Sequence, residues 1–187
     1  MPFTLFDTQI GACGIAWSDR GVSGVQLPET STDATRARLI RRWGDEAETE
    51  PPLQIAMVIE AIKSLMSGAP VDLTFAELDM EGIEPFARQV YEQARRIPPG
   101  ETRTYGQIAM ALGDKGLSRR VGQALGRNPF AIIVPCHRVL AAGGKIGGFS
   151  AGGGVATKLR MLSIERARTD PAPGLFDDLP LMARPKT

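Results

Sequence analysis

The chain has 187 residues, of which 43% are hydrophobic and 23% are charged, and its net charge is +1. This composition is ordinary for a globular protein with a sizeable core, and the net charge favours no class of partner. The two cysteines, Cys13 and Cys136, form no CxxC motif, and the single histidine is His137. These counts argue against a disulfide framework and against a metal site. Neither a signal peptide nor the roughly 18-residue apolar run of a membrane helix is present. We therefore expect a cytoplasmic protein without a membrane partner or cofactor, whose cysteines stay reduced.

Residues 1–82 are predicted to form a small α/β domain. The stretch GIAWSDRGVSGVQL has apolar residues on both sides of the turn signal SDRG, which predicts a β-hairpin. Residues 33–43 and 53–68 carry apolar side chains at helical spacing. Residues 71–80, VDLTFAELDM, alternate between apolar and polar and are predicted to be a strand.

Residues 83–166 are predicted to be mainly helical. Apolar residues recur at helical spacing in PFARQVYEQARRI, TYGQIAMALG and LSRRVGQALGRN. The last two of these stretches are joined by the turn GDKG. Two short helices joined in this way fit a helix-turn-helix, although the pattern alone favours an ordinary helical hairpin. FAIIV then reads as a short buried strand, TKLRMLSIE as a final helix, and residues 167–187 as a flexible tail.

Positive charge is concentrated in one part of this near-neutral chain. Residues 101–147 contain seven Lys or Arg residues against two acidic residues. A basic face centred on a helix-turn-helix favours nucleic-acid binding over an ordinary solvated surface.

Cys136 and His137 are adjacent in the motif PCHRV. A thiol becomes a good nucleophile when a neighbouring base takes its proton. Adjacency alone does not make such a pair, because neighbouring side chains of a strand point to opposite faces. The dipeptide therefore leaves open a catalytic thiol and an inert buried one. Pro135 is predicted to end the strand and bend the chain just before the cysteine.

The stretches IPPGETRTYGQIA, SRRVGQALGRNP and IIVPCHRV, with the glycine-rich loop and the helix ending at Glu165, closely resemble the O6-alkylguanine-DNA alkyltransferases. The resemblance runs from Phe86 to Glu165. It implies an α+β fold in which a small N-terminal RNase H-like domain precedes a winged helix-turn-helix domain. It also implies that O6-alkylguanine, and O4-alkylthymine, is flipped from duplex DNA and dealkylated irreversibly, once per molecule.

The resemblance implies roles for four catalytic residues. Cys136 matches the nucleophile, His137 the base that reaches the thiol through a water, and Glu165 the carboxylate that orients the imidazole. Tyr105 matches the tyrosine whose hydroxyl donates to the departing guanine.

Further matches concern DNA and the substrate pocket. Arg119 matches the arginine that fills the gap left by the flipped base, while Arg120 suits a phosphate contact. The other residues expected to bind DNA are Tyr105, Ser118, Gln123 and Arg127. Asn128 matches a hinge asparagine. The residues expected to form or support the pocket are Pro135, Arg138, Phe149, Ser150 and Lys158.

The partner expected from the resemblance is double-stranded DNA, bound from the minor groove without sequence preference by a monomer. Some family members hold a structural zinc, but Cys13 has no second cysteine or histidine near it, so no metal is predicted. The loop AGGGVAT is longer than is typical of the family. Three alternatives remain: a lesion-flagging relative, which would lack the cysteine; an alkylation-responsive regulator; and a thiol hydrolase that turns over.

Overall fold

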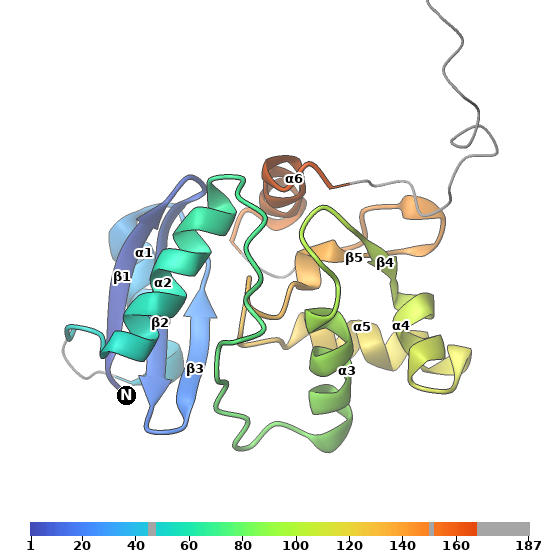
Figure 1. Ribbon diagram of the computed structural model, residues 1–187, viewed down its shortest axis with the longest axis horizontal. Coiled ribbons are helices and arrows are strands. Elements are labelled where there is room, and N and C mark those ends of the chain that lie inside the picture. The colour runs from blue at the N-terminus through green and yellow to red at the C-terminus, as the bar shows by residue number, and fades with distance from the viewer. Residues whose placement is uncertain (45–47, 150–151, 168–187) are drawn as a thin grey trace, which may run out of the picture.

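The structure, a computed structural model, describes residues 1–44, 48–149 and 152–167. The strands and helices follow one another in the order β1 (Phe3–Thr8), β2 (Gly11–Ser18), β3 (Gly21–Gln26), α1 (Thr32–Trp43), α2 (Leu53–Met66), α3 (Pro85–Arg95), β4 (Arg103–Thr104), α4 (Tyr105–Ala111), α5 (Ser118–Gly126), β5 (Val139–Leu140) and α6 (Gly154–Ile164). Figure 1 shows β1 to β3 with α1 and α2 on one side of the molecule, α3 to α5 on the other, and α6 between them. The predicted α+β class is confirmed. Almost all of the predicted tail lies outside the described residues.

The three N-terminal strands form an antiparallel sheet in the order β1-β2-β3. The predicted hairpin is confirmed, because β2 and β3 pair across a tight turn that places Ser18 opposite Gly21. The sequence pattern of residues 1–10 had not resolved β1 as a separate strand, although it supplies one edge of the sheet.

Helices cover both faces of this sheet (Figure 1). On one face, α1 lies so close to the strands that no side chain fits at two positions beneath it: a Cβ at Gly14 would lie 2.1 Å from Leu39 Cδ1, and one at Gly24 would lie 1.9 Å from Trp43 Cζ2. On the opposite face, Ile15 belongs to the main core together with the buried side of α2. Because β2 is covered on both faces, its five consecutive residues 13–17 are all buried.

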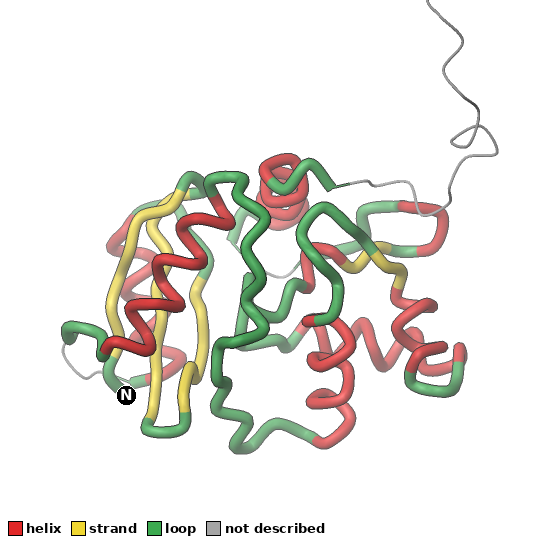
Figure 2. The backbone as a smooth tube through the Cα atoms, viewed as in Figure 1, coloured by secondary structure: helices red, strands yellow, loops and turns green. Residues whose placement is uncertain are grey.

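Residues 71–80 do not form the predicted strand and are drawn as loop in Figure 2. Asp72 accepts hydrogen bonds from the backbone N–H and the hydroxyl of Thr74, at 2.8 and 2.9 Å, and these bonds turn the chain. Nη2 of Arg95 donates to three backbone carbonyls of the same segment. Because a side chain occupies these carbonyls, the segment meets β3 at a single isolated bridge.

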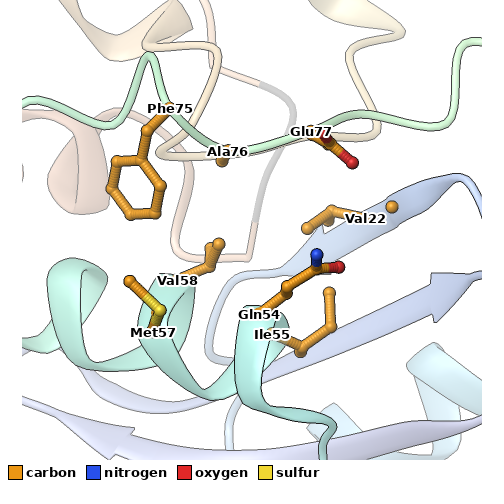
Figure 3. A pocket seen from close by; sticks show the side chains of 9 residues that line it. Val22, Gln54, Ile55, Met57, Val58, Phe75, Ala76 and Glu77 are labelled. Atoms are coloured by element: carbon orange, nitrogen blue, oxygen red, sulfur yellow. The ribbon is translucent and has the colours of Figure 1, made fainter.

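The same segment crosses α2 and leaves a hollow of about 150 Å³ whose lining includes both apolar side chains and the polar Gln54 and Glu77. Figure 3 shows Met57 and Val58 of α2 facing Phe75 and Ala76 of the crossing segment. Met57 and Phe75 are 54% and 51% exposed. The hollow contains none of the residues predicted to act in catalysis.

The predicted helices of the C-terminal half are present. α4 begins with a capping box, in which the Thr104 hydroxyl accepts from the Gln107 N–H at 3.1 Å and the Gln107 side chain accepts from the Thr104 N–H at 2.7 Å. A short turn then leads into α5, which packs against α4 and α3. Buried Tyr91 of α3 fixes this arrangement by donating its hydroxyl to the Ala124 carbonyl at 3.1 Å.

The two halves share one hydrophobic core. The edge strand β3 contacts the C-terminal half directly, since the N–H of Val25 donates to the Pro129 carbonyl at 2.8 Å. Val25 also forms a bridge with Phe130, whose side chain is fully buried. The backbone just before the PCHRV motif is therefore anchored to the N-terminal sheet.

Asp79 fastens the end of the irregular segment to the turn between β2 and β3. Its carboxylate accepts hydrogen bonds from Arg20 Nε at 3.0 Å and from the Ser18 hydroxyl at 2.6 Å. Hydrogen bonding from Arg20, opposed by burial, lowers the pKa of Asp79 from 3.8 to about 2. This stabilisation is complete above the unfolded-state pKa and is lost as the pH falls through the folded-state value.

We expect Asp79→Asn to lower the free energy of unfolding at pH 7 by about 1–2 kcal/mol, a value reduced because Arg20 is largely exposed. The difference from the wild type should shrink as the pH falls from about 4 towards about 2, because both proteins then carry a neutral group at this position. Urea unfolding at several pH values measures it. A difference that does not depend on pH would contradict the assigned ion pair.

Candidate active site around Cys136

Cys136 follows a buried turn that the side chain of Asn128 holds in place. Its Nδ2 donates to the Val134 carbonyl, and its Oδ1 accepts from the N–H of Phe130, both at 2.9 Å. Ile132, which is 1% exposed, has a φ of +71°. A β-branched residue adopts this left-handed conformation only when its surroundings impose it. The short buried strand predicted here is therefore wrong, because the asparagine amide takes the backbone groups that a strand would pair.

Pro135 was predicted to end a strand. It instead leads from this turn into the 3-10 turn Cys136–Arg138. The N–H of Arg138 donates to the Pro135 carbonyl at 2.9 Å. With three residues per turn, neighbouring side chains point about 120° apart. His137 and Arg138 are buried, whereas Cys136 is only partly buried.

Glu165, at the end of α6, binds both buried neighbours of the cysteine. Its Oε1 lies 2.9 Å from His137 Nε2. Arg138 donates to the same carboxylate twice, through Nε at 2.8 Å and Nη2 at 2.9 Å, and its Nη1 donates to the Ile97 carbonyl at 2.6 Å. One carboxylate therefore fixes the orientation of an imidazole and of a guanidinium.

The charges in this network follow from its hydrogen bonds. Burial opposes ionisation of Glu165, but the hydrogen bonds from His137 and Arg138 lower the pKa of its carboxyl to about 2. Burial lowers the pKa of His137, against the attraction of Glu165. The imidazole is thus neutral at pH 7 and donates its Nε2–H to the carboxylate, a tautomer assigned from this hydrogen bond. Its buried Nδ1, which has no hydrogen-bond partner among the described residues, is left as an acceptor.

Cys136 carries a thiol that is protonated at neutral pH. Burial raises its pKa, although Asn128 and the positive charge of Lys158 act in the opposite direction. Lys158 of α6 is itself buried and donates to the Val139 carbonyl at 2.6 Å. Such a thiol needs a base before it can act as a nucleophile.

The thiol lines a cavity of about 310 Å³ that is bounded by α4, α5 and the glycine-rich loop. Tyr105, the first residue of α4, and Phe149 of the loop contribute aromatic side chains to its wall. Burial raises the pKa of Tyr105, so its hydroxyl remains protonated. At Gly122 a Cβ would lie 3.9 Å from the Tyr105 ring, so this part of the wall carries no side chain. The cavity can accept a flat ring next to the thiol.

The outer face of α5 is polar and mostly basic. Arg119, Gln123 and Arg127 follow one another at a spacing of four residues, which places them on one face of the helix. All three are exposed. Arg120 is also exposed, and its guanidinium lies 4.1 Å from the ring centre of Phe86.

Known proteins share this sequence and arrangement. A family model for the DNA-binding domain of 6-O-methylguanine DNA methyltransferase matches residues 85–167. The methylated-DNA–protein-cysteine methyltransferases of Mycobacterium leprae and Mycolicibacterium paratuberculosis are 46% and 36% identical to the chain, each over 91% of it and 96% of the relative. The crystal structure of Mycobacterium tuberculosis OGT in complex with DNA matches with a TM-score of 0.70 and 32% identity, covering 92% of this chain and 96% of the other.

The chain belongs to the O6-methylguanine DNA methyltransferase family. The family resemblance of the sequence is thereby confirmed, and it extends over the N-terminal half, where the sequence motifs were weaker. No helix of the described ranges is long and apolar enough to cross a membrane. Within those ranges, no three His, Cys, Asp or Glu side chains are grouped as metal ligands.

The structure brings most of the predicted site residues of this methyltransferase together, but in two groups. One group surrounds the thiol and contains the partly buried Asn128 and the buried residues His137, Arg138, Lys158 and Glu165. The other group is exposed on α5 and just after it, and contains Arg119, Arg120, Gln123 and Arg127. Arg138 therefore does not belong to the exposed basic face to which its charge had been assigned. The hydroxyl of Ser118, which was expected to bind DNA, donates to the Lys115 carbonyl at 2.6 Å. Ser150 lies outside the described residues.

Sequence reasoning missed the contribution of the N-terminal half. Gln26 of β3 and Arg38 and Arg42 of α1 line a second cavity that also reaches Cys136. These residues are about 100 positions from the motif, and no local pattern marks them.

We expect Glu165→Gln to lower the free energy of unfolding by about 3–5 kcal/mol, because it leaves the buried Arg138 guanidinium without a counter-charge. Denaturant unfolding measures this loss. A matched control is Glu101→Gln, which breaks the exposed ion pair with Arg103 and should cost less than about 1 kcal/mol. Equal small losses in both variants would show that the buried network does not support the fold.

Proposed function

We propose that this chain removes the alkyl group from O6-alkylguanine, and from O4-alkylthymine, in duplex DNA by accepting it on Cys136. As a member of its family, the chain is a DNA-repair methylated-DNA–protein-cysteine methyltransferase. The observation that carries the residue assignment is the hydrogen bond between Glu165 and Nε2 of the neutral His137. It leaves the buried Nδ1 of His137 without a partner among the described residues, in the same 3-10 turn that carries the thiol. This is the nucleophile–base–orienter arrangement of covalent catalysis.

The reaction is a direct displacement. A water carries the thiol proton of Cys136 to Nδ1 of His137, and Glu165 stabilises the imidazolium that forms. The sulfur forms a bond to the alkyl carbon as the carbon–O6 bond breaks. The electron pair of the broken bond goes to the guanine oxygen. Tyr105 donates a hydrogen bond or proton to the guanine ring, a contribution typically worth about 10²- to 10⁴-fold. The thioether product is stable to water, so each molecule reacts once.

The remaining pocket residues hold this geometry. Asn128 keeps the turn before the cysteine in its left-handed conformation, and Pro135 directs the chain from that turn into the 3-10 turn. Arg138 neutralises Glu165. Phe149 lines the cavity that is proposed to hold the guanine, and Ser150 is assigned to guanine binding from the family resemblance alone. Lys158 is close enough to the thiol for its charge to assist the developing thiolate.

Duplex DNA binds to α4 and α5, from the minor groove and without sequence preference. A relative was crystallised in complex with DNA, and the exposed basic face of α5 supports DNA binding by this chain. Arg119, at the start of α5, enters the duplex in place of the flipped nucleotide. Ser118, Arg120, Gln123 and Arg127 contact the backbone of the DNA.

We further propose a division of the chain into residues 1–82 as a supporting domain, 83–166 as the alkyltransferase domain and 167–187 as a tail. The protein acts as a monomer without a cofactor, in the cytoplasm, where a thiol stays reduced. A lesion-flagging relative would lack the cysteine, and an alkylation-responsive regulator would need sequence-specific contacts to base edges.

Duplex DNA that carries a labelled O6-methylguanine tests the reaction. The wild-type protein should gain one methyl group on the peptide that contains Cys136, whereas Cys136→Ala should gain none. Cys13→Ala is the matched control and should react normally, because burial raises the pKa of the Cys13 thiol to about 12. Mass spectrometry measures the transfer. Label that remains on the DNA with the wild-type protein would refute the proposal.

Arg119→Ala tests base flipping. Repair of duplex DNA should slow by about tenfold or more, because flipping costs a few kcal/mol, while free O6-benzylguanine should react as before. Arg41→Ala, which removes an exposed charge of α1 that lines neither cavity at the thiol, should leave both reactions unchanged. Single-turnover kinetics measures both rates. Equal losses on the two substrates in Arg119→Ala would contradict its role in flipping.

A further inference from the structure

A cavity of about 340 Å³ lies where the segment after α2 meets the end of α3, and Cys136 is not among the residues that line it. Its apolar walls combine three prolines with the buried side chains of Leu73, Ile97, Ile132 and Ile133. A cavity of this size with apolar walls can bury an aromatic side chain.

Positive charge exceeds negative charge on the walls of this cavity. Arg95 is half-buried, and its Nη2 donates to three backbone carbonyls and not to an acidic side chain. Arg96 is exposed. Asp72 is the acidic residue of the lining, while the lining guanidinium of Arg138 is already compensated by Glu165. Two guanidinium groups and one carboxylate leave a local charge of +1, which favours an occupant that carries negative charge.

The described chain ends beside this cavity. A Cβ at Gly100, the residue after Pro99 of the cavity wall, would lie 3.4 Å from the carbonyl oxygen of Glu165. Figure 1 shows the end of α6 next to the loop that follows α3. Ala167, two residues further on, is the last described residue. Residues 168–187 therefore begin next to one wall of the cavity.

Residues 174–181, GLFDDLPL, carry side chains that suit this cavity. The stretch contains three leucines, Phe176 and the adjacent acids Asp177 and Asp178, and it has no basic residue. Residues 168–174 link it to Ala167. An extended chain spans about 3.3 Å per residue, so this link can reach about 25 Å. The stretch can therefore enter a cavity whose wall lies beside the end of α6.

The hollow between α2 and the crossing segment is a poorer match for the same stretch. It too has apolar walls, which include the exposed Met57 and Phe75. Glu77 also lines it, and no Lys or Arg is found among the described residues of its lining. Like charges would oppose docking of an acidic segment there. The charges therefore favour the cavity lined by Arg95 and Arg96.

We infer that the GLFDDLPL segment of this chain docks in the cavity lined by residues 70–74, 95–99 and 132–133, with Phe176 between the apolar walls and the two aspartates facing Arg95 and Arg96. A short link within one chain gives an effective concentration in the millimolar range, so a weak affinity is enough to fill the cavity. The docked segment covers the cavity face of the Arg138 guanidinium, which binds Glu165.

A photo-crosslinking benzoylphenylalanine at position 176 of the full-length protein tests the contact. Irradiation should join position 176 to peptides that contain residues 70–74 or 95–99 of the same chain, as identified by mass spectrometry. The same group at position 186, beyond the segment, is the matched control and should not favour these peptides. Crosslinks between two chains would assign the cavity to a second copy and overturn the proposal. Crosslinks to the hollow at α2, or none at all, would also overturn it.

An exchange of charges tests the orientation of the docked segment. Arg96→Glu should lower the crosslinking yield from position 176 by up to about fivefold, the limit for an exposed ion pair. Asp177→Arg combined with Asp178→Arg should lower it to a similar extent, and all three changes together should restore it. Arg41→Glu reverses an exposed charge outside the cavity and should leave the yield unchanged. A combined variant with a lower yield than either parent would contradict the pairing of these charges.

Phe176→Ala tests the burial of the aromatic side chain. Hydrogen exchange of the backbone amides in residues 71–76 and 95–97 should become faster by about tenfold, because the variant loses the gain from burying a large apolar side chain. Free peptide GLFDDLPL added to this variant should restore slow exchange, whereas GLADDLPL should not. Exchange that is the same in the wild type and in Phe176→Ala would overturn the proposal.

Discussion

The site depends on the buried carboxylate of Glu165, which binds two consecutive side chains of the PCHRV motif. Because His137 and Arg138 both point at this one group, the carboxylate fixes the 3-10 turn as well as the imidazole. The guanidinium compensates the negative charge, and without it the carboxylate would be costly to bury. The end of α6 and the cysteine-bearing turn therefore behave as one unit.

The N-terminal half supports this unit from the other side. β3 donates a backbone hydrogen bond to the chain at Pro129, at the beginning of the turn that Asn128 closes. The strained backbone of Ile132 persists because both of these hydrogen bonds and a buried environment hold it. The same sheet and α1 bring Arg38 and Arg42 to the cysteine. A domain whose sequence carries no catalytic motif thus shapes one wall of the site.

Sequence periodicity predicted the helices and the β2–β3 hairpin, because the signals for these elements are local. It failed for residues 71–80 and for FAIIV, whose apolar patterns resemble strands. In each case a polar side chain outside the segment, Arg95 about 20 residues away or Asn128 just before it, binds the carbonyls or amides that a strand would need. The pairing of His137 with Glu165 spans 28 residues and could be expected only from the family resemblance. Nothing local marked Arg38 or Arg42, because their place in the wall of a cavity with Cys136 depends on how the two halves pack.

The electrostatics of the site suit a protein that reacts once. A thiolate that is permanently ionised and accessible is also the form that oxidants attack. Here burial raises the pKa of Cys136, so the sulfur stays protonated while the cavity is empty. Burial lowers the pKa of His137, so the base is unprotonated and ready at the same pH. In the proposed mechanism, proton transfer between the two therefore creates the nucleophile during the displacement and not before it, and the sulfur is preserved for the one alkyl group that it is proposed to accept.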